Sequence, residues 1–173
     1  MLVGKPVLSR AIFAVGLVLA SAFAIPVAAG QIEDAQSAYL RGDYATALQL
    51  AQPLADRGDV VAQAQIGQMY EAGLGVSEDY AQALLWYQKA ADQGFILGQY
   101  LLGTMYERGE GVPQDFVLAH MWYNIAASHG DPASPGRRDA LGARMTSEQI
   151  AEAQKLARDW AAAHVEARRY WGL

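Results

Sequence analysis

The sequence predicts an all-α fold, an α-solenoid in which antiparallel helix pairs stack side by side. Three observations lead to this prediction. Segments Asp59–Gly94 and Phe95–Gly130 align over 36 residues without a gap, with 15 identical positions. Apolar residues in each copy recur at helical spacing. A glycine-rich loop that ends in aspartate divides each copy into two helices. Repetition at a period of 20–50 residues is typical of solenoids, because each unit buries its apolar face against the next.

In the second copy, apolar residues return at intervals of three and four on both predicted helices. They are Leu102, Met105 and Tyr106 on the first helix, and Ala119, Trp122 and Tyr123 on the second. The intervening segment GEGVPQD begins with a glycine suited to end a helix. It finishes with Asp115, which is suited to cap the next helix. The first copy has the same arrangement, with Asp79 as the cap.

The residues shared by the two copies each have a packing explanation. Gly67 and Gly103 lie inside helices, where glycine costs about 1 kcal/mol relative to alanine, so we expect two helix backbones to approach there. The tryptophan–tyrosine pairs should be buried in the core, and Gly73 and Gly109 should adopt the left-handed conformation that ends the first helix of each copy. The predicted structural residues are Gly67, Tyr70, Gly73, Gly75, Asp79, Trp86 and Tyr87, with their counterparts Gly103, Tyr106, Gly109, Gly111, Asp115, Trp122 and Tyr123.

Weaker repeats flank the two copies. Residues 30–58 predict a degenerate first repeat, because AYLRGDYATALQLAQPLADRG keeps the Gly-Asp-Tyr turn but lacks the long loop. After residue 130 we expect a loop at Asp131–Pro135 and a short helix near Arg137–Arg144. Thr146 and Gln149 form a capping-box pattern ahead of a predicted terminal helix, Ser147–Arg168. Residues 131–173 would therefore be a half-repeat and a capping element.

The segments AQIGQMYEAGLGVSEDYAQALLWYQKAADQG and MWYNIAASHG resemble the Sel-one-like repeat family, whose members are related to tetratricopeptide repeats. The resemblance covers 59–94 and 95–130 in full, and 35–58 in weaker form. It implies a stack of helix pairs with a concave face. Gly98 departs from the alanine found in the first copy, and we expect it to loosen the start of its helix.

The first 29 residues have the pattern of a bacterial secretory signal peptide. Lys5 and Arg10 precede the apolar run Ala11–Ala24, which is followed by small residues. This order of a basic, an apolar and a small-residue segment predicts cleavage after Ala29, with Ala24 as the alternative site. The mature chain would be periplasmic or secreted. An uncleaved membrane anchor is the alternative, because extending the run to residue 29 approaches the length of a membrane span.

Composition excludes several classes of function. The chain has no cysteine, which rules out disulfides, cysteine-based zinc sites and thiol nucleophiles. Its net charge is −5; signal removal takes two of 13 basic and none of 18 acidic residues, leaving −7. An acidic chain without a basic patch is a poor ligand for nucleic acid or anionic lipid.

No catalytic, cofactor or metal site is predicted. The Gly-x-Gly loops lack the Lys-Ser/Thr and the preceding strand of a phosphate-binding loop. His120, His129 and His164 lack metal-ligand spacing, and we expect them to be on the surface or half-buried. The acidic pairs Glu107/Glu110 and Glu78/Asp79 are interpreted as solvated charges, because catalytic carboxylates need a partly desolvated pocket.

The sequence therefore favours a non-enzymatic protein-interaction module that binds a protein or peptide on its concave face. By analogy with the tetratricopeptide groove, the first helix of each copy would present the binding residues. The predicted groove residues are Gln68, Glu71, Tyr100, Thr104, Glu107 and Arg108, together with Ala72. The alternatives are an accessory or weak hydrolase acting on cell-wall material, and a structural spacer without a specific partner.

Overall fold

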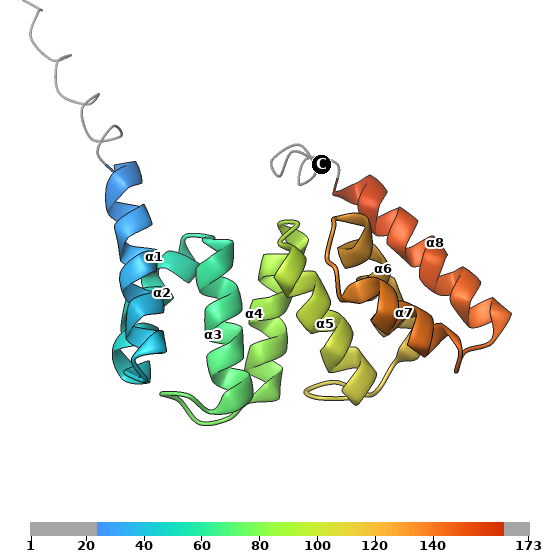
Figure 1. Cartoon of the computed structure of the whole chain (residues 1–173), viewed down its shortest axis with the longest axis horizontal. Coiled ribbons are helices and arrows are strands. Elements are labelled where there is room, and N and C mark those ends of the chain that lie inside the picture. The colour runs from blue at the N-terminus through green and yellow to red at the C-terminus, as the bar shows by residue number, and fades with distance from the viewer. Residues whose placement is uncertain (1–23, 165–173) are drawn as a thin grey trace, which may run out of the picture.

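The computed structural model describes residues 24–164 as eight helices, with no strand in that range. The helices are α1 (Ala24–Leu40), α2 (Tyr44–Asp56), α3 (Val60–Ala72), α4 (Tyr80–Asp92), α5 (Ile96–Arg108), α6 (Phe116–Ser128), α7 (Ser134–Gly142) and α8 (Ser147–Ala163). The helices α1 to α6 lie side by side across the long axis of the molecule, and the row they form extends along that axis (Figure 1). The two complete copies occupy α3–α4 and α5–α6.

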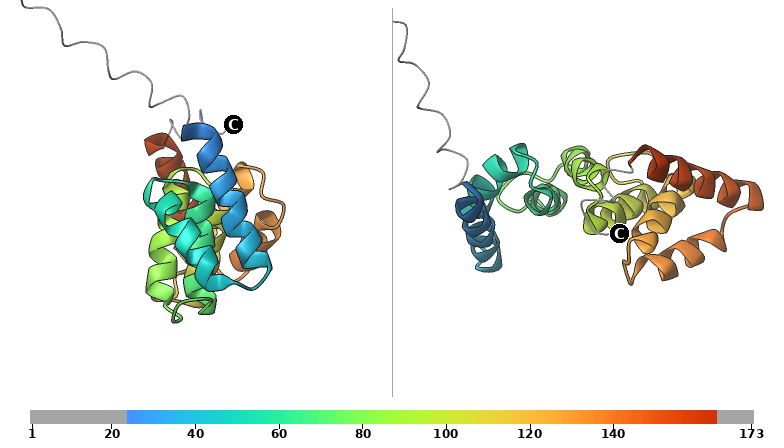
Figure 2. Two further views of the ribbon diagram at one scale, coloured as in Figure 1. Left: turned by 90° about the vertical axis from the view of Figure 1, so that its left-hand side faces the viewer. Right: turned by 90° about the horizontal axis from the view of Figure 1, so that it is seen from above.

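Each helix from α1 to α6 packs against the next one in the chain, so the molecule is an open row of helices (Figure 2). This arrangement confirms the predicted α-solenoid. At the C-terminal end of the row, α6 contacts two later helices, α7 and α8, whereas each earlier helix packs against the next one in the chain. Ala153 and Ala157 of α8 are buried in the same cluster as Trp122. The terminal helix therefore covers the last complete repeat, as predicted.

The helix ends follow the sequence signals closely. Gly73 and Gly109 end α3 and α5 in the left-handed conformation, at φ of 64° and 74°. Asp79 accepts a hydrogen bond from the Gln82 backbone N–H at 3.0 Å, and Asp115 accepts one from Leu118 at 2.9 Å. These contacts confirm the predicted caps.

The glycines inside α3 and α5 have a different partner from the one predicted. A Cβ at Gly67 would lie 2.6 Å from Cδ1 of Tyr87, and a Cβ at Gly103 would lie 2.6 Å from Cε1 of Tyr123. The close approach is thus between a helix backbone and an aromatic ring of the next helix, not between two backbones. The prediction was wrong because a tyrosine ring occupies the space that a side chain would fill.

Gly98 is also needed for packing. A Cβ at this position would lie 3.0 Å from both the Ala90 Cβ and the Ala91 backbone nitrogen. The residue is buried where α5 crosses the C-terminal half of α4. The expectation that Gly98 loosens its helix is therefore corrected: it allows α4 and α5 to approach.

The tryptophan–tyrosine pairs form the core. Tyr87 and Tyr123 are fully buried, and Trp86 and Trp122 are 7% and 4% exposed. Tyr70 and Tyr106 are partly buried against the same clusters.

The region after the repeats differs slightly from the prediction. Helix α7 begins at Ser134, inside the segment predicted as a loop, because Asp131 accepts a hydrogen bond from the Ser134 N–H at 2.6 Å and Pro135 occupies the first turn. The predicted capping box of Thr146 and Gln149 is present at the start of α8. Helix α8 reaches Ala163, and the predicted extension to Arg168 lies outside the described residues.

The predicted signal segment lies mostly outside the described residues. Residues 1–23 are not described, and the predicted cleavage site after Ala29 falls within α1. Over the described residues, none of the helices combines the length and the apolar character that a membrane crossing requires.

We expect Gly103→Ala to lower the free energy of unfolding by about 1–3 kcal/mol, because the added methyl group overlaps the buried ring of Tyr123. The matched control is Gly136→Ala in α7, where a Cβ meets nothing within 4 Å. There the helix preference of alanine should raise stability by up to about 1 kcal/mol. Urea denaturation followed by circular dichroism measures both. Equal effects of the two changes would contradict the assigned contact.

Candidate functional site

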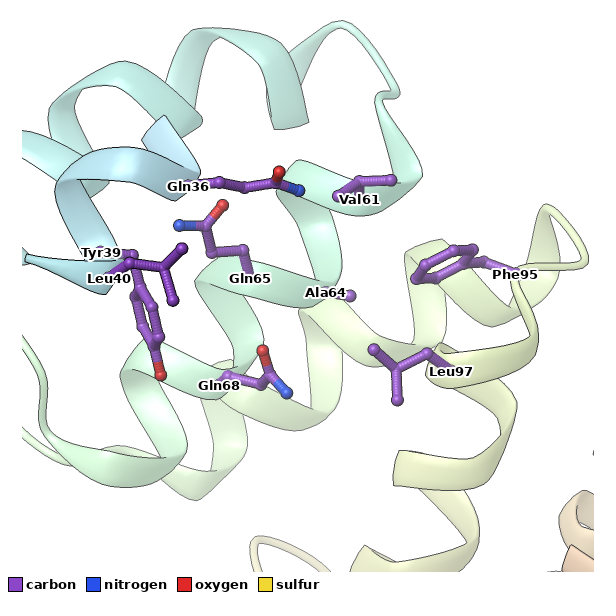
Figure 3. Close-up of a pocket in the computed structure, with 9 residues that line it drawn as sticks. All are labelled: Gln36, Tyr39, Leu40, Val61, Ala64, Gln65, Gln68, Phe95 and Leu97. Carbon is purple, nitrogen blue, oxygen red and sulfur yellow. The ribbon is translucent and has the colours of Figure 1, made fainter. Parts of the chain in front are cut away.

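A groove opens between the first helices of three successive pairs, α1, α3 and α5 (Figure 3). It encloses a cavity of about 260 Å³. Its lining residues are Gln36, Tyr39, Leu40, Val61, Ala64, Gln65, Gln68, Phe95 and Leu97. Tyr39 and Leu40 lie on one side and Phe95 and Leu97 on the other, with the side chains of α3 between them.

The groove exposes large apolar side chains. Leu40 is 84% exposed and Leu97 is 40% exposed. Among the described residues the exposed large hydrophobic residues are these two and Leu85 of α4, so two of the three line one groove. None of the lining residues carries a formal charge. Exposed apolar residues gathered in one groove are a feature of interaction sites, whereas single exposed hydrophobic residues are ordinary.

Phe95 replaces a residue that has a structural role in the preceding copy. Asp59 caps α3 by accepting hydrogen bonds from Val61 and Ala62 at 3.0 and 2.9 Å. The equivalent residue before α5 is Phe95, and this helix has no side-chain cap. Losing such a cap costs about 1 kcal/mol. The second copy thus lacks this side-chain cap at the position where it adds an aromatic ring to the groove.

Three glutamines line the groove, Gln36 of α1 and Gln65 and Gln68 of α3. Gln65 is buried, and its Nε2 donates to the Ala35 carbonyl at 3.3 Å. Its Oε1 has no hydrogen-bond partner among the described residues. Gln68, one turn further along α3, is half-buried beside it. A few amides within an apolar lining are common in binding sites, where they fix the orientation of a ligand.

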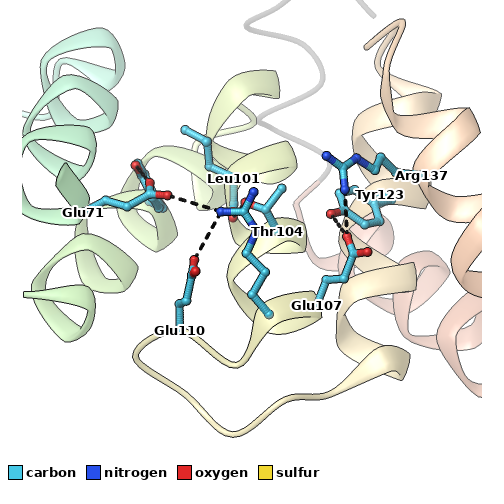
Figure 4. A network of polar contacts seen from close by, with 9 residues as sticks. Glu71, Leu101, Thr104, Glu107, Glu110, Tyr123 and Arg137 are labelled. Atoms are coloured by element: carbon cyan, nitrogen blue, oxygen red, sulfur yellow. Dashed lines mark hydrogen bonds and ion pairs between the residues drawn. The ribbon is translucent and has the colours of Figure 1, made fainter.

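The predicted groove residues Glu71 and Glu107 have a structural role. Tyr87 Oη donates to Glu71 Oε2 at 2.5 Å, and Tyr123 Oη donates to Glu107 Oε2 at 2.6 Å (Figure 4). Burial and this hydrogen bond raise the pKa of both tyrosines. Each glutamate therefore joins the two helices of its own repeat, which explains why the glutamate is present in both copies.

Arginines from the following repeat approach the same glutamates. Arg108 Nη1 lies 4.0 Å from Glu71 and 3.5 Å from Glu110, and Arg137 Nη1 lies 3.5 Å from Glu107 (Figure 4). The side chains of Arg108 and Arg137 are about half exposed, so each pair contributes little stability. Of these pairs, Glu71–Arg108 is the one next to the apolar groove, because Glu71 lies one helical turn beyond the lining residue Gln68 on α3.

The remaining predicted groove residues are only partly accessible. Thr104 is 6% exposed and its hydroxyl donates to the Leu101 carbonyl at 2.7 Å. The ring of Tyr100 lies 5.8 Å from that of Tyr123, near Arg137. Of the seven predicted residues, Ala72 included, Gln68 alone lines the α1–α3–α5 groove. Sequence reasoning missed the α1 residues and Leu97; the replacement of aspartate by Phe95 was the available signal.

His120 and His129 are buried, at 4% and 6% exposure, which corrects the expectation of surface or half-buried histidines. His129 Nδ1 lies 2.9 Å from Oε1 of Gln99, whose Nε2 in turn donates to the Ala91 carbonyl at 3.5 Å. In the preceding copy, Gln93 and Gln63 make the equivalent contact at 2.9 Å. His129 thus belongs to a polar contact that joins successive repeats.

His120 lies at the bottom of a polar cleft of about 510 Å³ between α6, α7 and α8. Its Nδ1 has no hydrogen-bond partner among the described residues. Burial, and to a lesser extent the charge of Arg138, lower the pKa of His120, while Asp139 opposes this shift. The equivalent position in the first copy is Leu84. Over the described residues, no three histidine, aspartate or glutamate side chains come together as metal ligands.

We expect Tyr123→Phe to lower the free energy of unfolding by about 1–3 kcal/mol, because the hydrogen bond that the Tyr123 hydroxyl donates to the charged carboxylate of Glu107 is lost. The matched control is Tyr100→Phe, since Tyr100 has no such bond to Glu107. Chemical denaturation of both variants provides the comparison. A double-mutant cycle with Glu107→Gln should show coupling between Tyr123 and Glu107, and additive effects would contradict the assigned bond.

We expect His120→Leu to stabilise the protein more at pH 5 than at pH 7.5. Because the pKa of His120 is lower in the folded protein, the unfolded chain binds a proton at this histidine more readily than the folded chain does. The histidine therefore lowers the free energy of unfolding as pH falls below its unfolded pKa of about 6.5. Leucine removes that cost and the buried nitrogen without a partner. Thermal melts across this pH range measure the difference. A stability difference independent of pH would contradict the assignment.

Comparisons with known proteins agree with this architecture. A family model described as Sel1 repeat matches residues 60–95 and 96–131. The fold is similar to a protective antigen of uropathogenic Escherichia coli strains that displays an SLR fold, with a TM-score of 0.77, 26% identity and 84% of this chain covered. The match spans 32% of that antigen, about a third of its length.

A Sel1 repeat protein from Oxalobacter formigenes is 38% identical, with a TM-score of 0.59. The match covers 65% of this chain and 88% of that protein. A search of curated proteins gave no match.

Proposed function

This chain belongs to the Sel1 repeat family, and we propose that it is a non-enzymatic interaction module of the bacterial envelope. Sel1 repeats generally mediate protein–protein interaction, and the fold is typically a non-catalytic scaffold. Within this proposal, residues 1–29 are a signal peptide, 30–58, 59–94 and 95–130 are repeats, and 131–173 complete the C-terminal end. The pattern of the first 29 residues supports export to the periplasm or beyond.

The observation that carries the proposal is the uncharged groove of α1, α3 and α5, in which Leu40 and Leu97 remain exposed. First helices of successive repeats line it, which is the face expected to bind by analogy with tetratricopeptide repeats. We propose that a segment of another envelope protein lies along this face. The protein would then act as an adaptor or regulator in an envelope assembly.

The size of the groove favours side chains over a cofactor. A cavity of about 150 Å³ lined by apolar residues can hold one benzene ring, whereas sites for drug-sized ligands occupy about 300–1,000 Å³. At about 260 Å³ the groove has room for one or two apolar side chains. A preformed groove loses little conformational entropy on binding. Affinity should nevertheless be modest, because few repeats contribute, unless the partner is multivalent.

The hydrolase alternative has less support. Glu107 and His129, the residues considered for such chemistry, accept or share hydrogen bonds that join helices or repeats. The spacer alternative would leave the apolar exposure of the groove without a role.

We expect Leu97→Asp and Leu40→Asp to weaken capture of the native partner from envelope extracts by at least about tenfold, because a charge would be placed in the apolar groove. The matched control is Leu85→Asp, an exposed leucine of α4 outside the groove. Quantitative mass spectrometry of the captured proteins measures the change. Equal loss in all three variants, or in none, would contradict the proposed site.

Phe95→Asp separates binding from stability. Aspartate restores the cap residue of the first copy, and a gain of about 1 kcal/mol from the cap should offset the packing lost with the ring. We therefore expect little change in thermal stability but weaker partner capture. Unchanged capture by this folded variant would indicate that Phe95 has no part in binding.

A further inference from the structure

We infer that the bound segment carries a leucine- or phenylalanine-sized anchor next to a basic residue, with the anchor between Leu40 and Leu97 and the basic side chain toward Glu71 and Glu110. This inference rests on the proposed function and specifies the chemistry of its partner.

The anchor follows from the lining of the groove. Its two sides are formed by Tyr39 and Leu40 and by Phe95 and Leu97, with Ala64 between them. An inserted charge would lose its hydration there without meeting an opposite charge, whereas an apolar side chain would cover exposed apolar surface. The small Ala64 leaves the room that the anchor occupies.

The basic neighbour follows from the charges beside the groove. Glu71 lies one turn beyond Gln68, so both side chains share one face of α3. Among the described residues, Glu71 and Glu110 pair with one cation between them, Arg108, at 4.0 and 3.5 Å, so that the two carboxylates exceed their described ion-pair partners by one negative charge. The two carboxylates remain 24% and 27% exposed.

The surroundings of these two carboxylates support a negative local potential. The pKa of Tyr80 is raised mainly by Glu78, with further contributions from desolvation and from Glu110 and Glu71, while Arg108 opposes the shift. On the α1 side, the exposed cation Arg41 directly follows Leu40. The basic residue of the partner should therefore lie toward α3 and α5, and not toward α1.

A random dodecapeptide phage library, selected on the purified full chain, tests this inference. Synthetic versions of the enriched peptides are then titrated against variants by fluorescence anisotropy. The variants are Leu97→Asp for the anchor and Glu71→Gln with Glu110→Gln for the charge. Glutamine at position 71 keeps an acceptor for Tyr87, so the helix pair is retained. Glu148→Gln on α8 is the matched charge control, and circular dichroism checks that each variant is folded.

We expect the enriched peptides to share a large apolar residue beside lysine or arginine. Their Kd should rise at least about tenfold with Leu97→Asp and about threefold with the double glutamine variant, but not with Glu148→Gln. Peptides that depend on Leu97 but are acidic or uncharged would overturn this inference and leave the proposed function standing. Peptides that bind Leu97→Asp as well as the wild type, or no enrichment, would overturn both.

Discussion

The contact on which the structure depends is that of a buried tyrosine ring against a glycine, with the tyrosine hydroxyl bonded to a glutamate one turn further along the glycine's helix. Tyr123 packs against Gly103 in this way and donates to Glu107 at 2.6 Å. The same unit occurs in the preceding repeat. The ring requires a residue without a side chain at the glycine position, and the hydroxyl requires an acceptor. Glycine, tyrosine and glutamate therefore depend on one another. This unit sets the distance between the two helices of each repeat.

Contacts between repeats then extend the row. Gly98 lets α5 approach α4, and Gln99 joins the end of α4 to the end of α6 through Ala91 and His129. These contacts use buried groups on the sides that face neighbouring repeats. Another face of the first helices lines the groove, and on this face the two copies differ in sequence. Asp59 of one copy is replaced by Phe95 in the next. The groove is therefore a consequence of regular stacking combined with local changes in sequence.

Much of this fold could be predicted, because repetition and helical spacing depend on local sequence. The caps at Asp79 and Asp115 and the capping box at Thr146 needed no knowledge of distant residues. The partner of Gly103 could not be predicted, since a glycine does not indicate whether a backbone or a ring lies opposite it.

The binding site was harder to predict for the same reason. Glu71 and Glu107 occupy the expected face, but their bonds to tyrosines on other helices depend on tertiary packing. Leu40 belongs to the groove because α1 contributes to the same lining as α3 and α5, and this arrangement cannot be seen in the sequence of α1 alone. Single positions could be read from the sequence, whereas a groove formed by three helices requires their arrangement in space.

Hydrogen–deuterium exchange of the chain, free and with its captured partner, tests the central claim most directly. If the partner lies along the first helices, amides of 36–40, 61–68 and 95–97 should exchange more slowly in the complex, and those of α4 and α8 should be unchanged. Protection confined to α4, α6 or α8 would contradict the account and place the interaction on another face of the solenoid.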